Sequence, residues 1–237
     1  MADIPANIDK INDIEVALDA PITEQLFNKI GANINALIDL TGGINFRFYE
    51  ANDTWTKPSS LSKILVFLTG PGGNGGSGAT NPSGVSFGNS RGGGGAGATV
   101  IKLIDASLLS STESIVIGSP GVNSTFGSLV TAAFGASAPA ANGQFGAGGV
   151  ASGGDLNVNG GDGHIGTLTG STNGASGGGV NLNGHGGASF FGGGGKAGVG
   201  ATAGLAGKAY GSGGAGGSTG GAGKNGVCII IEMFSAL

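Results

Sequence analysis

A chain of 237 residues with 39% hydrophobic residues is long enough for one large or two small domains and too apolar for a solvated, disordered polymer. Charged residues make up 10% of it, against roughly 25% in an average globular domain, and the net charge of -4 comes without a basic stripe, so nucleic acid is not an expected partner. No apolar run approaches the ~20 residues that span a bilayer, and the start lacks the features of a cleavable signal peptide, so we expect a soluble protein.

Residues 1–43 are predicted to form a helical, coiled-coil-like stem. Thr23 is a suitable N-cap, Gly42 and Gly43 provide a stop, and the apolar positions between them follow the three-four alternation of a heptad: Phe27, Ile30, Ile34 and Leu37. A helix this short is marginal in water, so its apolar stripe must pack on something. One alternative is packing on the chain's own C-terminal domain. The other is a bundle of identical chains, and isoleucine at both kinds of seam position favours a homotrimer in which these four residues form the trimerisation seam.

From Ile44 the apolar spacing changes to period two, which predicts an all-β, sandwich-like domain over residues 44–237. Strands are expected over 45–50, 62–69, 98–104, 113–117, 129–134 and 226–234. No helix is expected after Leu40, apart from a possible turn around 107–111. The first and last long strands are expected to be neighbours in the core, with Cys228, the single cysteine, as a small buried hydrophobe in the last one.

Glycine dominates the middle of the chain, where all of the 55 glycines lie except Gly31, Gly42 and Gly43. Glycine loses the most backbone freedom on folding, so an ordered stretch this rich in it requires close backbone packing. Residues 156–160 and 180–184 repeat an alternation of apolar and polar residues that is typical of short strands. By composition alone the remainder would be a flexible linker, but it is bracketed by strong strands and far exceeds an ordinary loop in length. The regular glycine of collagen is absent, which excludes a triple helix, and short, glycine-lined extended rungs with loops between them are predicted.

The two ends of this region carry a family resemblance. Thr54-Trp55-Thr56-Lys57-Pro58, the apolar run 61–68 and the tract 70–76 resemble the start of the glycine-rich distal domain of bacteriophage tail fibres and related bacterial trimeric fibre adhesins. The closing tract 220–226 and the apolar run 227–234 resemble that family's end. The resemblance covers residues 54–234 and implies a receptor-binding tip, usually trimeric, on a virion tail fibre or an extracellular, cell-surface fibre. In such tips the strands form the support and the glycine-rich loops meet the target cell.

No pattern in the chain predicts catalysis, a metal or a cofactor. His164 and His185 each follow a polar residue and a glycine, which suits exposed loop histidines better than a metal pair. Asp155 and Asp162 follow similar glycine pairs, but Ile165 stands where the calcium motif of repeat toxins requires an aspartate. None of the Gly-x-Ser-x-Gly matches leads into a helix, so an enzyme is not expected.

Receptor contacts are expected from the few large or polar side chains in the glycine background. Phe190, Phe191 and Tyr210 suit either buried anchors between rungs or exposed faces for hydrophobic and sugar-stacking contacts. The polar candidates are Asn89, Arg91, Asn183 and His185. The expected partner is a bacterial surface glycan, a lipopolysaccharide or an outer-membrane protein. The alternative function is a structural spacer or assembly element of a fibre without receptor binding.

Overall fold

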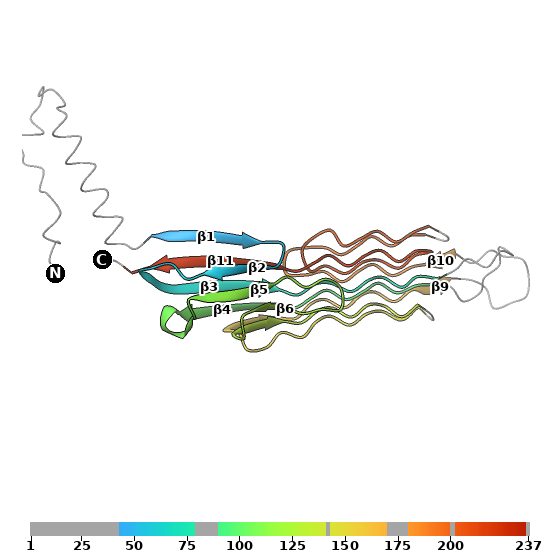
Figure 1. Ribbon diagram of the computed structural model, residues 1–237. Helices are drawn as coiled ribbons and strands as arrows, with labels where there is room; N and C mark the ends of the chain where they lie inside the picture. Colours follow the sequence, from blue (N-terminus) through green and yellow to red (C-terminus); the bar gives the residue numbers. More distant parts are fainter. Residues whose placement is uncertain (1–42, 79–89, 141–142, 170–179, 200–201, 236–237) are drawn as a thin grey trace, which may run out of the picture.

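The computed structural model describes residues 43–78, 90–140, 143–169, 180–199 and 202–235. These residues form an elongated molecule with β-sheets at one end and glycine-rich segments running lengthwise from them (Figure 1). The predicted stem falls on residues outside these ranges. Its seam of Phe27, Ile30, Ile34 and Leu37, and the homotrimer built on it, therefore stay predictions.

The described part of the chain is an all-β structure in which every strand pair is antiparallel. A five-stranded sheet has the order β1-β11-β3-β4-β8, with β1 (Ile44–Tyr49), β11 (Val227–Phe234), β3 (Leu61–Thr69), β4 (Thr99–Asp105) and β8 (Leu156–Val158). A four-stranded sheet has the order β2-β5-β6-β7, with β2 (Asp53–Thr56), β5 (Thr112–Val116), β6 (Ser124–Phe126) and β7 (Val130–Ala132). A small two-stranded sheet pairs β9 (Thr167–Thr169) with β10 (Val180–Leu182), and a short 3-10 helix, η1 (Ala106–Leu108), follows β4.

All six expected strands are present. β1, β3, β4, β5, β7 and β11 occupy the expected places, with ends that differ by a few residues. β3 and β11 are hydrogen-bonded neighbours, as expected of the first and last long strands. The repeated segments form β8 and β10 in two different sheets. β2, β6 and β9 have no counterpart among the expected strands.

The hydrophobic core lies between the two large sheets. Along β3 the alternate residues Ile64, Val66 and Leu68 are buried, which is the period of a strand with one face on a core. Trp55 of β2 and Phe126 of β6 pack edge to face from the opposite sheet, with ring centroids 5.9 Å apart. The core is therefore sandwich-like.

The glycine-rich segments are ordered by backbone hydrogen bonds that repeat every third residue. In segment 90–98, Gly93 and Ala96 donate to 161–164, Gly94 and Gly97 donate to 211–214, and Gly95 and Ala98 donate to 133–136. Carbonyl groups of the same segment accept from 70–76, 146–149 and 184–187. This is the three-residue turn of a polyproline II-type helix, whose backbone groups all point outward to neighbours. The expected extended rungs are present, and the structure shows in addition that they are threefold and form a hydrogen-bonded lattice.

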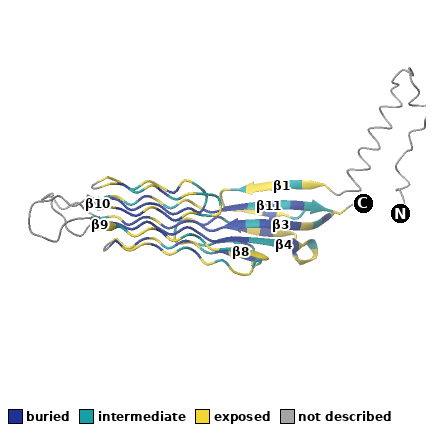
Figure 2. Ribbon diagram, turned by 180° about the vertical axis from the view of Figure 1, so that it is seen from behind, coloured by how far each residue is buried: buried dark blue, intermediate teal, exposed yellow. Residues whose placement is uncertain are grey.

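The hydrogen bonds arrange these segments in three layers. The middle layer holds segments 143–150, 90–98, 211–218 and 202–208, and one outer layer holds 133–140, 70–78 and 219–226. The other outer layer, here called the histidine layer, consists of 159–166, 182–189 and 192–199. Segments 90–98 and 211–217 are surrounded and buried along their lengths, which is visible as the dark inner traces in Figure 2.

Close packing explains why the lattice needs glycine. A Cβ atom on Gly93 would overlap the carbonyl oxygen of His185, and one on Gly94 would overlap the carbonyl oxygen of Gly73. The obstacle is the backbone of a neighbouring segment, which cannot turn aside as a flexible side chain can. The glycine content thus reflects the short distance between adjacent segments, as at the crowded axis of collagen.

Candidate functional site

The candidate site lies at the distal end, which we define as the end of the molecule that carries β9 and β10 (Figure 1). The described residues on either side of the ranges 79–89, 141–142, 170–179 and 200–201 all lie there. The first and last described residues lie at the opposite end, where Phe234 donates its backbone N–H to the carbonyl oxygen of Gly43 at 3.0 Å. The described chain therefore begins and ends at the sheet end, and the glycine lattice extends from there to the distal end.

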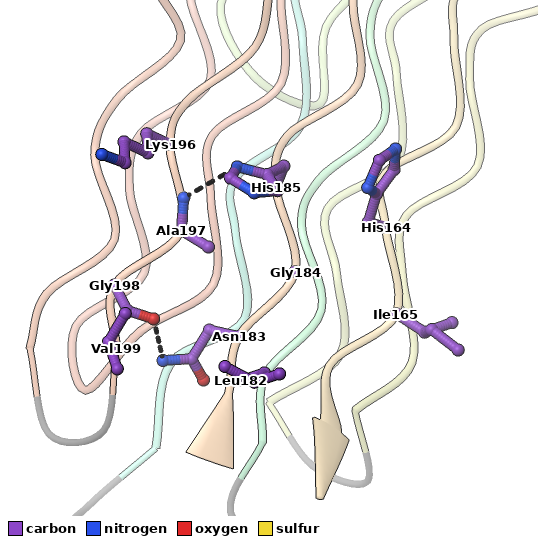
Figure 3. A pocket seen from close by; sticks show the side chains of 10 residues that line it. All are labelled: His164, Ile165, Leu182, Asn183, Gly184, His185, Lys196, Ala197, Gly198 and Val199. Atoms are coloured by element: carbon purple, nitrogen blue, oxygen red, sulfur yellow. Dashed lines mark hydrogen bonds between the residues drawn. The ribbon is translucent and has the colours of Figure 1, made fainter. Parts of the chain in front are cut away.

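A depression of about 340 Å³ opens on the histidine layer near the distal end (Figure 3). Its lining comes from all three segments of that layer: His164, Ile165, Leu182, Asn183, Gly184, His185, Lys196, Ala197, Gly198 and Val199. Along the middle segment the exposed residues are Leu182, His185 and Ala188. This spacing of three places one side chain per turn on the open face.

The two histidines are neighbours across adjacent segments. Their rings pack edge to face with centroids 5.9 Å apart, and the backbone N–H of His164 donates to the carbonyl oxygen of His185 at 2.9 Å. Nδ1 of His185 accepts a hydrogen bond from the backbone N–H of Ala197 at 3.1 Å. Because Nδ1 is an acceptor, the neutral ring carries its proton on Nε2, which is the remaining donor for a ligand.

Polar and apolar side chains form two separate rows across the depression, with His164, His185 and Lys196 in one row and Ile165, Leu182 and Val199 in the other (Figure 3). Ile165, Leu182 and Val199 are exposed hydrophobic residues on its rim. Lys196 is exposed on the third segment, and the described lining contains no carboxylate. The surface thus combines apolar side chains with a few hydrogen-bond donors, as small-molecule sites do.

Asn183 and Arg91, which the sequence analysis assigned to a recognition surface, lie in the interior. Asn183 accepts a hydrogen bond from the backbone N–H of Arg91 at 3.0 Å and donates to the carbonyl oxygen of Gly198 at 2.9 Å. The Arg91 side chain is buried against Gly78, where a Cβ would overlap the guanidinium group. Both residues are therefore structural parts of the lattice. The two hydrogen bonds of Asn183 fix its amide and Gly198, which both line the depression.

The predicted aromatic residues lie at the sheet end of the lattice, away from His185. Phe190 and Phe191 have ring centroids 5.2 Å apart, and Phe191 and Tyr210 are 6.2 Å apart. Tyr210 also packs against Phe48 of β1 at 5.8 Å, and its hydroxyl donates to the Glu50 carboxylate. That hydrogen bond raises the pKa of Tyr210 above its ordinary value. The predicted site residues thus fall into two separate places, and Asn89 lies outside the described residues.

Several lining residues were not among the predicted contacts: His164, Ile165, Leu182, Lys196 and Val199. The available signal was the recurrence of a polar residue, glycine and histidine at 162–164 and 183–185, which the lattice places side by side. The neighbours of this pair depend on which segments become adjacent, and sequence spacing does not reveal that order.

The described residues contain no cluster of three or more histidine, cysteine or acidic side chains suited to hold a metal ion. No helix in the described ranges is long and apolar enough to cross a membrane. No protein-family model and no curated protein sequence matches the chain.

Proposed function

We propose that the protein is the receptor-binding tip of a fibre and that the depression on the histidine layer contacts a ligand on a bacterial cell surface. The observation that carries this proposal is the placement of the two ends. The described chain enters and leaves beside Gly43 and Phe234, while the depression lies at the distal end of the lattice. A molecule attached at the sheet end would present the depression outward.

The lattice is suited to hold a binding surface in one shape. Its segments are cross-linked by backbone hydrogen bonds on several sides, and the side chains of the depression rise from adjacent segments at fixed spacing. A preorganised surface loses little conformational entropy when a ligand binds. Because so few residues are charged, specificity comes from shape and hydrogen bonds, with little long-range electrostatic steering.

The proposed function is binding without catalysis. The described lining offers histidine and lysine side chains, but no carboxylate, hydroxyl or thiol side chain stands beside them as a catalytic partner. The proposed ligand is a surface glycan, alone or as part of lipopolysaccharide, with an outer-membrane protein as the other candidate. The owner of the fibre is a phage, or a bacterium that carries phage-derived fibres.

Binding of fluorescently labelled protein to a panel of bacterial strains, including strains that lack capsule or O-antigen, tests this proposal. His185→Ala and Lys196→Ala are expected to reduce binding to a recognised strain on the order of tenfold each, since each removes a polar contact. Lys208→Ala is the matched control, because Lys208 is also exposed but lies outside the depression. Equal binding by all three variants would contradict the proposed site.

The alternative is a spacer or assembly element, and the hydrogen-bonded lattice favours it as a second candidate because such a body is stiff. Under this alternative, changes at His185, Phe190 or Tyr210 disturb assembly of the fibre. Under the receptor-binding proposal, a variant at His185 assembles normally and loses cell binding. Electron microscopy of assembled fibres beside the cell-binding measurement separates the two.

A further inference from the structure

The outward face of the five-stranded sheet carries two apolar rows that cross it from strand to strand, beside a row that ends in the Lys63–Asp105 pair. The register aligns Phe46 of β1 with Ile231 of β11, Leu65 of β3 and Leu103 of β4. A second row aligns Phe48, Ile229, Phe67, Ile101 and Leu156. We call these two rows, together with Ile44 and Met233, the outer sheet face. A sheet with one face in water normally carries polar residues on that face.

The outer sheet face is open over much of its extent. Phe46 is 69% exposed, Ile44 65% and Phe48 54%. On β3, β4 and β11 the opposite face holds buried core residues, so these three strands are apolar on both sides, whereas β1 carries Asn45 and Arg47 on its opposite side. An antiparallel sheet in water normally presents a polar outer face, so an apolar outer face indicates that something covers it. At the lattice end the face continues into the cluster of Phe48, Tyr210 and Phe191.

We propose that residues 23–40 of the same chain cover the outer sheet face as an amphipathic helix, with Phe27, Ile30, Ile34 and Leu37 toward the sheet. This inference is independent of the receptor-binding proposal. It uses the stripe that the sequence analysis also considered for a trimer seam, and it assigns that stripe to the alternative of packing on the chain's own domain.

The dimensions of stripe and face agree. The stripe from Phe27 to Leu37 spans ten residues, which is about 15 Å along a helix at 1.5 Å per residue. The apolar residues of β1 from Ile44 to Phe48 span about 14 Å, and the distance across the sheet from β1 to β4 is about the same. One helix of this length therefore covers the width of the face.

The connection between stripe and face is short. Gly43 lies beside the end of β11 and leads directly into Ile44, the first exposed apolar residue of the face. Gly42 and Gly43 form the kind of glycine stop that ends a helix and reverses the chain. A tether this short gives the stripe a high effective concentration at its own sheet, which favours packing within one chain over packing between chains.

Cross-linking in the full-length chain tests this packing. Ile34→Cys combined with Phe46→Cys is treated with a short bismaleimide, and mass spectrometry separates linkage within one chain from linkage between chains. The control combines Ile34→Cys with Ser114→Cys, because Ser114 is exposed on the four-stranded sheet. The native Cys228 is buried and does not compete.

Linkage within one chain is expected on the order of tenfold more often for the Phe46→Cys pair than for the Ser114→Cys pair. Mixing isotopically labelled Ile34→Cys chains with unlabelled Phe46→Cys chains is expected to give almost no linkage. Abundant linkage in that mixture would show that another copy covers the face and would overturn the proposal. Equal yields for the two pairs would overturn it too, since the stripe would then have no preference for this face.

Discussion

The indole Nε1 of Trp55 donates a hydrogen bond to Oε1 of Glu232 at 2.7 Å, and this bond joins the two large sheets inside the core. Glu232 is fully buried and also accepts from Asn45 at 2.7 Å and from Arg47 at 3.3 Å. A carboxylate in this position is tolerated because its oxygens have several donors. The Trp55 of the Thr-Trp motif therefore has a structural role as a donor across the sandwich.

Glu232→Gln is expected to lower the free energy of unfolding by about 1–3 kcal/mol, because the amide offers one acceptor where the carboxylate offered two and brings its own donors. Urea denaturation of the two proteins measures the change. Asp105→Asn is the control, because Asp105 pairs with Lys63 on the surface and exposed pairs contribute little. A loss for Asp105→Asn as large as that for Glu232→Gln would argue against the buried network.

Gly93→Ala is expected to cost about 3 kcal/mol or more, because the new methyl group would overlap the backbone carbonyl of His185 and force two segments apart. Gly193→Ala is the matched control in the other tetraglycine tract, where no heavy atom lies within 4 Å of the added Cβ. The control is expected to change stability by less than about 0.5 kcal/mol. Thermal unfolding followed by circular dichroism compares the two, and similar melting temperatures would contradict the close-packed lattice.

The thiol of Cys228 is expected to resist alkylation in the folded protein. Burial raises its pKa to about 12, so the reactive thiolate is scarce at pH 8. Iodoacetamide is expected to modify the unfolded chain in guanidinium and to leave the folded chain largely unmodified over the same time. Rapid modification under native conditions would place Cys228 outside the core.

The same pKa predicts a loss of stability in alkaline solution. The folded state holds the thiol proton more tightly than the unfolded state, so this contribution is complete below about pH 9 and is lost as the pH rises toward 12. The slope from this group is at most about 1.4 kcal/mol for each pH unit. Cys228→Ala removes the titrating group, and its alkaline loss is expected to be smaller. An identical pH dependence in both proteins would show that other groups cause the effect.

The mass of the protein in solution distinguishes a stem that packs on its own sheet from a stem that forms a trimer. With the stripe on its own sheet we expect 22.5 kDa by light scattering after size exclusion, whereas a stem-zipped trimer has three times that mass. A truncation beginning at Gly42 is expected to expose the outer sheet face and to associate non-specifically. A trimeric full chain that becomes a clean monomer on truncation would restore the homotrimer predicted from the heptad.

Among the features predicted from the sequence, the long strands and the buried Cys228 were recoverable because they depend on local patterns. Along β3 and β11 every second residue faces the core, which a local sequence pattern can indicate. The apolar run around Cys228 likewise indicates that this residue is buried. Extended glycine-lined rungs were also predictable, since glycine at this density excludes an ordinary core, but their threefold hydrogen bonding was not. The residues that line the depression were only partly predictable, because their exposure depends on which segments become neighbours.

What the sequence by itself determined is therefore the β domain, its glycine-rich middle and an amphipathic start. Only the tertiary structure decided the order of the glycine segments, because backbone hydrogen bonds between glycines carry no side-chain code for the partner. That order buries Arg91 and Asn183, places His164 beside His185 and moves Tyr210 to the sheet end. The strand register, likewise a tertiary feature, brings apolar residues that lie far apart along the chain together on the outer sheet face.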